Sequence, residues 1–276
     1  MSDVTHEISA GLRAGRLIPY LGTGVSELRP PGDVPASPAD LAAFLGRQVA
    51  LPKRARGNPW AAAQYIESRR HRSTLTALMD KAYAEPVQPV GLHEMLAAYA
   101  PPLIVDTWYD GAMRTALEAG CPPDAWGEIQ GITRAGIGEF QWFRAYDAAG
   151  QEVPVGEARG WKTILYKPHG SVTPAHNYLI ADSDYVEVLT EIDIQTPIPE
   201  IVRFRRAECG FVFLGCRFDD QMLRIYARQI MKRSAGPYYA VVEPEVMSRN
   251  ELRFLEINGI RPVCISLDAM AEMLVA

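Results

Sequence analysis

One histidine and one aspartate stand just beyond short apolar runs, where the chain could place side chains for chemistry. His169 follows the run 163–166, and Asp110 follows the run 103–105. Histidine titrates near neutral pH and can take a proton from a sugar hydroxyl or a water molecule, while a carboxylate can fix a bound ligand. His169 and Asp110 are therefore the candidate catalytic residues.

A glycine turn follows the first apolar run, Leu17 to Leu21, and reads Gly22-Thr23-Gly24-Val25-Ser26. Glycines at the carboxyl end of a buried strand let the backbone approach a phosphate group. The third glycine of the dinucleotide-binding fingerprint is absent, because residues 27–38 are polar or proline-rich. Taken alone, this stretch fits a phosphate-binding turn and an ordinary tight turn equally well.

The elements that must position these residues are short apolar runs alternating with helical patterns. This alternation predicts an α/β fold with a Rossmann-like, doubly wound parallel sheet, whose carboxyl edge would carry the ligand. His169, Asp110 and the glycine turn would all lie on that edge. The expected strands cover residues 17–21, 103–105, 163–166, 211–214, 238–242 and 262–265.

Two segments interrupt this alternation inside what we expect to be a single domain over residues 1–276. Residues 40–100 have helical spacing and predict an inserted, mainly helical lobe, which begins at an N-cap, Ser37, followed by Pro38. Residues 120–161 lack clear periodicity and predict a small, irregular, aromatic-rich insertion of short strands and loops. Its aromatic residues are expected to pack in a core; a base-stacking surface is the alternative.

Composition argues against several classes of function. The chain of 276 residues carries a formal net charge of -5, so it lacks the basic field of a general nucleic-acid-binding protein. The arginine clusters at 53–56 and 69–72 are expected to be solvated surfaces; a nucleic-acid-associated subunit is the weakest alternative. The amino terminus is polar and no apolar run has the length of a membrane span, so we expect a cytoplasmic protein without a membrane anchor. The four cysteines form no Cys-x-x-Cys pair, and no metal site is expected.

Four short motifs, taken in order, resemble the SIR2-like domain family, the bacterial relatives of sirtuins that occur in NAD-consuming anti-phage defence proteins. They are Leu21 to Ser26, Thr107 to Asp110, His169 to Ser171 and Phe213 to Asp220. The resemblance implies a Rossmann-like fold that binds NAD as substrate or ligand. It also implies that His169 is the catalytic histidine.

The same resemblance assigns the remaining binding residues. It implies that Gly22, Thr23, Gly24 and Ser26 lie at the pyrophosphate, and that Gly215 and Arg217 approach the ribose and phosphate on the adenosine side. General Rossmann logic adds Glu243, at the end of the fifth strand, as a group that could bind a ribose hydroxyl.

The chain departs from the family pattern at two positions. Trp108 stands where the family motif Thr-x-Asn-x-Asp has the asparagine that orients the nicotinamide ribose and the attacking water. Tryptophan cannot accept a hydrogen bond there, and its bulk could fill space that the ligand needs. Arg217 replaces a small serine and could either pair with a phosphate or crowd the adenosine end. The zinc-binding cysteines of protein-deacylating sirtuins are also absent, which argues against peptide deacylation.

The resemblance therefore implies an NAD+ glycohydrolase that releases nicotinamide and ADP-ribose, with NAD depletion in anti-phage defence as its role. The alternative, raised by Trp108, is a catalytically silent sensor or partner subunit that binds NAD or ADP-ribose. A homo-oligomer or a co-encoded defence partner fits either activity.

Overall fold

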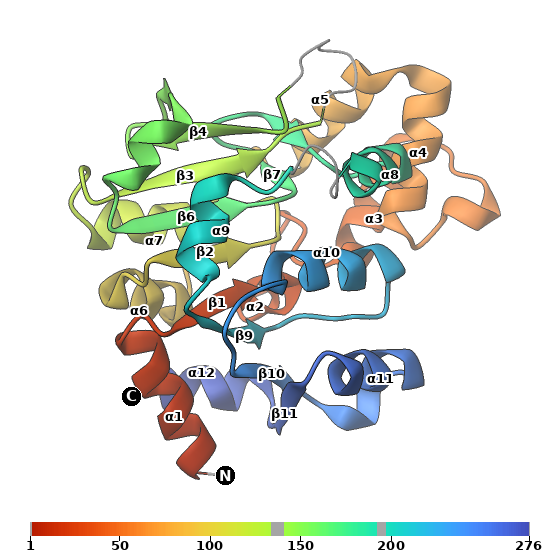
Figure 1. The fold of residues 1–276 in the computed structure, drawn as a ribbon. Coiled ribbons are helices and arrows are strands. Elements are labelled where there is room, and N and C mark those ends of the chain that lie inside the picture. The colour runs from red at the N-terminus through yellow and green to blue at the C-terminus, as the bar shows by residue number, and fades with distance from the viewer. Residues whose placement is uncertain (1, 134–140, 192–196, 276) are drawn as a thin grey trace.

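The centre of the protein is a nine-stranded, mostly parallel sheet with helices on both faces (Figure 1). This computed structural model describes residues 2–133, 141–191 and 197–275. The strand order is β11-β10-β9-β1-β2-β6-β3-β4-β5. The six expected strands are present as β1 (Leu17–Leu21), β2 (Leu103–Asp106), β6 (Thr163–Lys167), β9 (Gly210–Leu214), β10 (Tyr238–Val242) and β11 (Ile260–Cys264).

The short strands expected within residues 120–161 are present as three strands, which join the central sheet. β3 (Trp126–Gly131) pairs with β6 in parallel, and β4 (Phe143–Asp147) and β5 (Glu152–Val153) extend the sheet in antiparallel fashion. The position of β3 could not be predicted because Glu128 and Gln130 interrupt its apolar pattern although both are fully buried. Their burial is possible because the Arg114 guanidinium donates to Glu128 Oε2 at 2.9 Å, and Gln130 Nε2 donates to Glu128 Oε1. The expectation of an irregular insertion therefore holds for only part of this segment.

The two faces of the sheet bury two separate apolar clusters, as a doubly wound fold requires. In β1, Ile18 and Tyr20 point to the cluster that includes residues of α9 and α10, whereas Leu17 and Leu21 point to the cluster of α1, α6, α7 and α12. Successive side chains of a strand alternate in this way. The covering helices are α1 (Ser2–Arg13), α6 (Gly91–Tyr99), α7 (Ala112–Gly120), α9 (Glu200–Arg206), α10 (Gln221–Met231), α11 (Arg249–Ile257) and α12 (Leu267–Val275).

A helical lobe projects beyond the carboxyl edge of the sheet and has its own apolar cluster (Figure 1). It comprises α3 (Pro38–Gln48), α4 (Pro59–Arg70) and α5 (Arg72–Ala82), with α8 (Asp182–Glu191) packed on α4. Ser37 caps α3 in a capping box with Asp40, as expected. The lobe is shorter than the predicted 40–100 insertion, because α6 covers the sheet.

Three short elements complete the path of the chain near the carboxyl edge. The helix α2 (Thr23–Glu27) follows β1 directly, and β7 (Gly170–Ser171) pairs with β8 (Asn177–Tyr178) beyond β6. In the described part of the chain, no helix combines the length and the apolar character that crossing a membrane requires.

Candidate functional site

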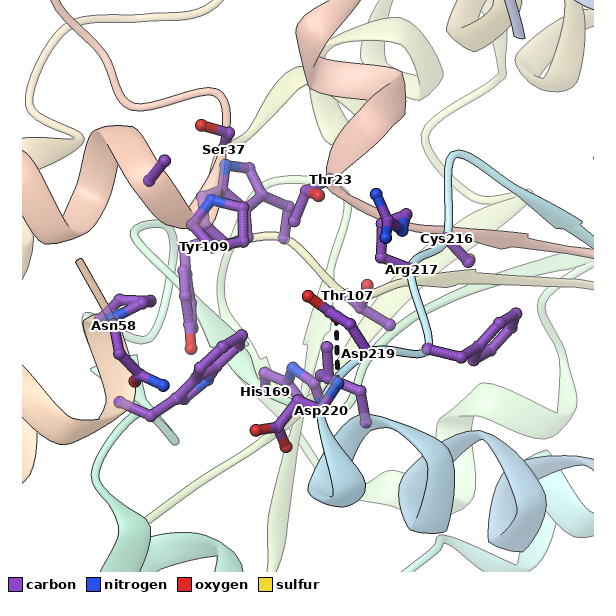
Figure 2. Close-up of a pocket in the computed structure, with 18 of the residues that line it drawn as sticks. Thr23, Ser37, Asn58, Thr107, Tyr109, His169, Cys216, Arg217, Asp219 and Asp220 are labelled. Atoms are coloured by element: carbon purple, nitrogen blue, oxygen red, sulfur yellow. Dashed lines mark hydrogen bonds between the residues drawn. The ribbon is translucent and has the colours of Figure 1, made fainter. Parts of the chain in front are cut away.

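A cavity of about 600 Å³ lies between the carboxyl edge of the sheet and the helical lobe (Figure 2). Segments that follow β1, β2, β6 and β9 form one wall, and the starts of α3 and α4 form the other. Ligands bind at this edge in open parallel sheets. The residues that line the cavity include Thr23, Ser37, Asn58, Trp60, Thr107, Trp108, His169, Arg217, Asp219 and Asp220.

The glycine turn after β1 packs tightly against the turn after β9. Gly22 N–H donates to Leu214 O, and Gly24 N–H donates to Gly215 O, both at 2.9 Å. A Cβ atom on Gly22 would lie only 2.4 Å from Gly215 O, and Gly215 itself has φ +63. These glycines are therefore required by the contact between the two turns. Gly22 and Thr23 also line the cavity, so the turn faces the ligand space as well.

The predicted adenosine-side residues lie around a second, smaller cavity of about 380 Å³. Gly215, Arg217 and Glu243 line it, together with Gly24, which was predicted to lie at the pyrophosphate. Arg217, together with Glu27, lines both cavities and thus stands where they meet. The structure brings the predicted binding residues together in two adjoining spaces, with Ser26 as the exception.

His169 is almost fully buried at the wall of the first cavity, and its Nε2 atom has no hydrogen-bond partner in the described structure. Its ring stands edge-on to the rings of Tyr185 and Tyr226, which fix its orientation. Burial lowers the pKa of His169 to about 3. A hydrogen bond with the Thr107 backbone opposes this shift, and the Lys167 cation adds to it. The imidazole is therefore neutral at physiological pH, and Nε2 is free to accept a proton or a hydrogen bond.

Asp110 lies outside both cavities, although sequence reasoning made it a catalytic candidate. It is buried behind the glycine turn, where Oδ2 accepts from Ser26 Oγ at 2.9 Å and from Arg29 Nη1 at 3.0 Å. Lys167 Nζ contacts Asp106 Oδ2 at 2.7 Å and the Asp110 carbonyl at 2.8 Å. We call Ser26, Arg29, Asp106, Asp110 and Lys167 the Asp110 cluster.

The electrostatics of the Asp110 cluster favour the charged form of the Asp110 carboxylate. Burial alone would raise the pKa of Asp110, but the cations of Lys167 and Arg29 hold it below its ordinary value. With its oxygens occupied by Ser26, Arg29 and the Ala112 N–H, Asp110 is arranged to hold the turns together. Direct contact with a ligand in the cavity is not part of this arrangement.

Trp108 is packed into the core of the helical lobe and does not project freely into the cavity. The residue is 3% exposed, and its ring contacts the rings of Tyr83 and Tyr109. The indole Nε1 donates to Pro35 O at 3.0 Å, and Arg29 Nη2 donates to the same carbonyl at 3.3 Å. Trp108 thereby fixes the proline-rich segment that leads into α3.

Arg217 is paired with Glu251, which was not predicted as a site residue. Its guanidinium donates to both oxygens of Glu251, at 2.9 and 3.1 Å, and Glu251 also accepts from the Phe218 N–H. Burial works to raise the pKa of Glu251, but the hydrogen bonds from Arg217 and Ser248 lower it to about 2. Arg217 therefore neither crowds the cavity as an unpaired cation nor offers its full charge to a phosphate.

Three helix caps lie in the cavity wall and were not predicted as site residues. Ser37 caps α3, Asn58 caps α4 and Asp220 caps α10, so three helices of at least 11 residues begin at this space. The N-terminal end of a helix carries partial positive charge and favours anions. The Asn58-Pro59 pair signals a helix start, but only the tertiary structure shows that this start faces His169.

The described residues, with gaps at 134–140 and 192–196, contain no group of three or more His, Cys, Asp or Glu side chains placed to hold a metal ion. A search of curated proteins finds no match to the chain. The model of the SIR2-like domain family matches residues 102–263. This match covers more than half of the chain and includes Trp108, His169 and Arg217. The chain therefore belongs to the SIR2-like domain family, whose members are associated with NAD.

Proposed function

We propose that the two adjoining cavities bind NAD and that the protein hydrolyses the bond between nicotinamide and ribose. The observation that carries this proposal is the buried Nε2 atom of His169, which has no partner within the described structure and faces a cavity large enough for part of a dinucleotide. An unpaired buried polar atom carries a free-energy cost, which a ligand hydroxyl could remove.

The ligand would extend from His169 toward Glu243. In this placement the nicotinamide riboside lies near His169, the pyrophosphate near Gly22 and Thr23, and the adenosine in the second cavity beside Glu243. Three carboxylates, Glu27, Asp219 and Asp220, also line the first cavity. Because Arg217 is already paired, we expect backbone N–H groups and the ends of α3, α4 and α10 to balance the pyrophosphate charge.

The reaction consumes NAD+ and water and yields nicotinamide, ADP-ribose and a proton. The C–N bond breaks with its electron pair leaving on nicotinamide, and the ribose passes through an oxocarbenium-like state. Water then forms the new C–O bond. The neutral His169 accepts a hydrogen bond or a proton from the ribose hydroxyl or the water at Nε2, and the bulk solvent takes the proton afterwards.

A second candidate, a silent sensor that binds NAD or ADP-ribose, is favoured by two observations. The family asparagine is replaced by Trp108, whose N–H is already used by Pro35. The low pKa of His169 also makes it a weak base.

Either protein would act in the cytoplasm, where a hydrolase would deplete NAD during phage infection and a sensor would act with a partner subunit. Both proposals treat the chain as one domain.

The test measures NAD binding and nicotinamide release on the same purified protein, beside His169→Ala and Trp108→Asn. Release that falls at least about 100-fold in His169→Ala supports the hydrolase. Binding without release supports the sensor, and release gained by Trp108→Asn would show that tryptophan silences an otherwise complete site. Absence of binding to the wild-type protein would refute both proposals.

A further inference from the structure

The helical lobe presents one side chain to the cavity whose hydrogen-bonding capacity is not used up. Asn58 Oδ1 accepts from the Ala61 N–H at 2.9 Å and caps α4, while its Nδ2 group makes no hydrogen bond to another described residue. Gly57, at φ +77, provides the left-handed backbone turn that leads into this cap. Figure 2 shows Asn58 and Arg217 on opposite sides of the view, with His169 between them.

Most of the other side-chain donors in the cavity wall are already committed within the protein. Each donates to a neighbouring group and so has little left for a ligand. The pairs are Ser37 with Asp40, Trp60 with Tyr185, Thr107 with Leu21 O, Trp108 with Pro35 O, Tyr109 with Leu179 O, and Cys216 with Tyr20 O. The unpartnered Nε2 atom of His169 supplies an acceptor in the same wall. The cavity therefore offers a ligand an acceptor from the sheet and a donor from the lobe.

We propose that Asn58 is a specificity-determining residue whose Nδ2 group donates to the carboxamide oxygen of nicotinamide. The inference rests on the proposed NAD site and assigns the nicotinamide end of that site to the lobe. Neutral His169 accepts from a ribose hydroxyl, and Asn58 donates to the carbonyl of the planar carboxamide. Trp60, two residues after Asn58, also lines the cavity, and its indole is held by a 3.3 Å hydrogen bond to Tyr185. It offers an aromatic surface beside the ring.

This assignment accounts for the tryptophan at position 108. Trp108 packs in the lobe and fixes the segment before α3, so it has become part of the framework that holds the lobe against the sheet edge. The amide that meets the ligand then comes from Asn58, which lies outside the family match at 102–263. Trp108 supplies no amide to this cavity, and the lobe provides one through Asn58.

The test compares two ligands and three variants of the full chain by titration calorimetry. The ligands are a non-cleavable carbocyclic analogue of NAD and ADP-ribose, which lacks nicotinamide. Asn58→Ser and Asn58→Gly remove the amide but keep residues that are accepted as N-caps, so the fold should persist. Ser37→Gly is the matched control, because Ser37 is also a cap in the cavity wall but its hydroxyl is already used by Asp40. Thermal unfolding followed by circular dichroism confirms that each variant is folded.

We expect both Asn58 variants to bind the NAD analogue about fivefold to tenfold more weakly, the worth of one neutral hydrogen bond, with ADP-ribose affinity unchanged within about twofold. Ser37→Gly should leave the ratio of the two affinities unchanged. Equal losses for both ligands, or no loss, would overturn the role of Asn58 while leaving the NAD site intact. If the wild type binds neither ligand, the proposed NAD site fails and this inference fails with it.

Discussion

Two buried polar regions at the same edge of the sheet differ in how their hydrogen bonds are satisfied. In the Asp110 cluster, the Asp110 carboxylate and the Lys167 ammonium have partners within the protein at 2.7 to 3.1 Å. At the cavity wall, His169 Nε2 and Asn58 Nδ2 have none among the described residues. The cluster holds the turns in place, whereas the cavity wall retains unused donors and acceptors.

This difference separates structural polar residues from candidate ligand-binding ones better than burial does. Asp110 and His169 are 2% and 3% exposed, and both follow strands at the ligand edge. Burial and position in the sequence therefore do not distinguish them. Removing a member of the Asp110 cluster should reduce stability, and removing His169 should mainly affect the ligand.

The largest effect is expected for Lys167→Met, which keeps the length of the side chain but removes its charge. Asp106 would be left with a buried, unpaired carboxylate, and the free energy of unfolding should fall by about 3 to 5 kcal/mol. Urea denaturation followed by tryptophan fluorescence measures the change. A loss below about 1 kcal/mol would show that the Asp110 cluster does not hold the turns in place.

The next effect is a fall in stability with acidification. Because burial lowers the pKa values of His169 and His93 below the ordinary 6.5, the unfolded chain binds more protons than the folded one as the pH falls below about 6.5. For His169 this window extends down to about pH 3. Each histidine then contributes a loss of up to about 1.4 kcal/mol per pH unit.

Unfolding measured between pH 7.5 and 5 in wild type and His169→Gln tests this linkage. Relative to its own value at pH 7.5, the variant should show a shallower loss of stability below pH 6.5 than the wild type, because one titrating group has been removed. Parallel curves for the two proteins would contradict the buried, neutral state of His169.

The smallest effect is expected for Trp108→Phe, which keeps an aromatic ring in the lobe core. Loss of the N–H bond to Pro35 should lower the free energy of unfolding by about 1 kcal/mol, since Arg29 still donates to the same carbonyl. Differential scanning calorimetry with Tyr83→Phe as a ring-preserving control measures it. A loss equal to that of Lys167→Met would mean that Trp108 stabilises the fold as strongly as the Asp110 cluster does.

Much of the fold could be predicted from local patterns, and what was not predicted depends on contacts between separate segments of the chain. The six buried runs and the N-cap Ser37 were recognisable because hydrophobic runs and capping residues act over a few positions. The position of β3 was not recognisable, since its buried Glu128 depends on Arg114 from a neighbouring helix. The glycine turn was found, but its packing against Gly215 depends on a strand about 190 residues away in the chain.

The sequence by itself determined the alternating strands and helices, the glycine turn at the end of β1 and the placement of polar residues at one edge of the sheet. Only the tertiary structure decided which of those polar residues stay available. It paired Asp110 with Arg29 and Arg217 with Glu251, and it left His169 and Asn58 facing one cavity from opposite walls. The physical reason is that a run of residues sets its own periodicity, whereas a hydrogen-bond partner depends on which distant segments meet.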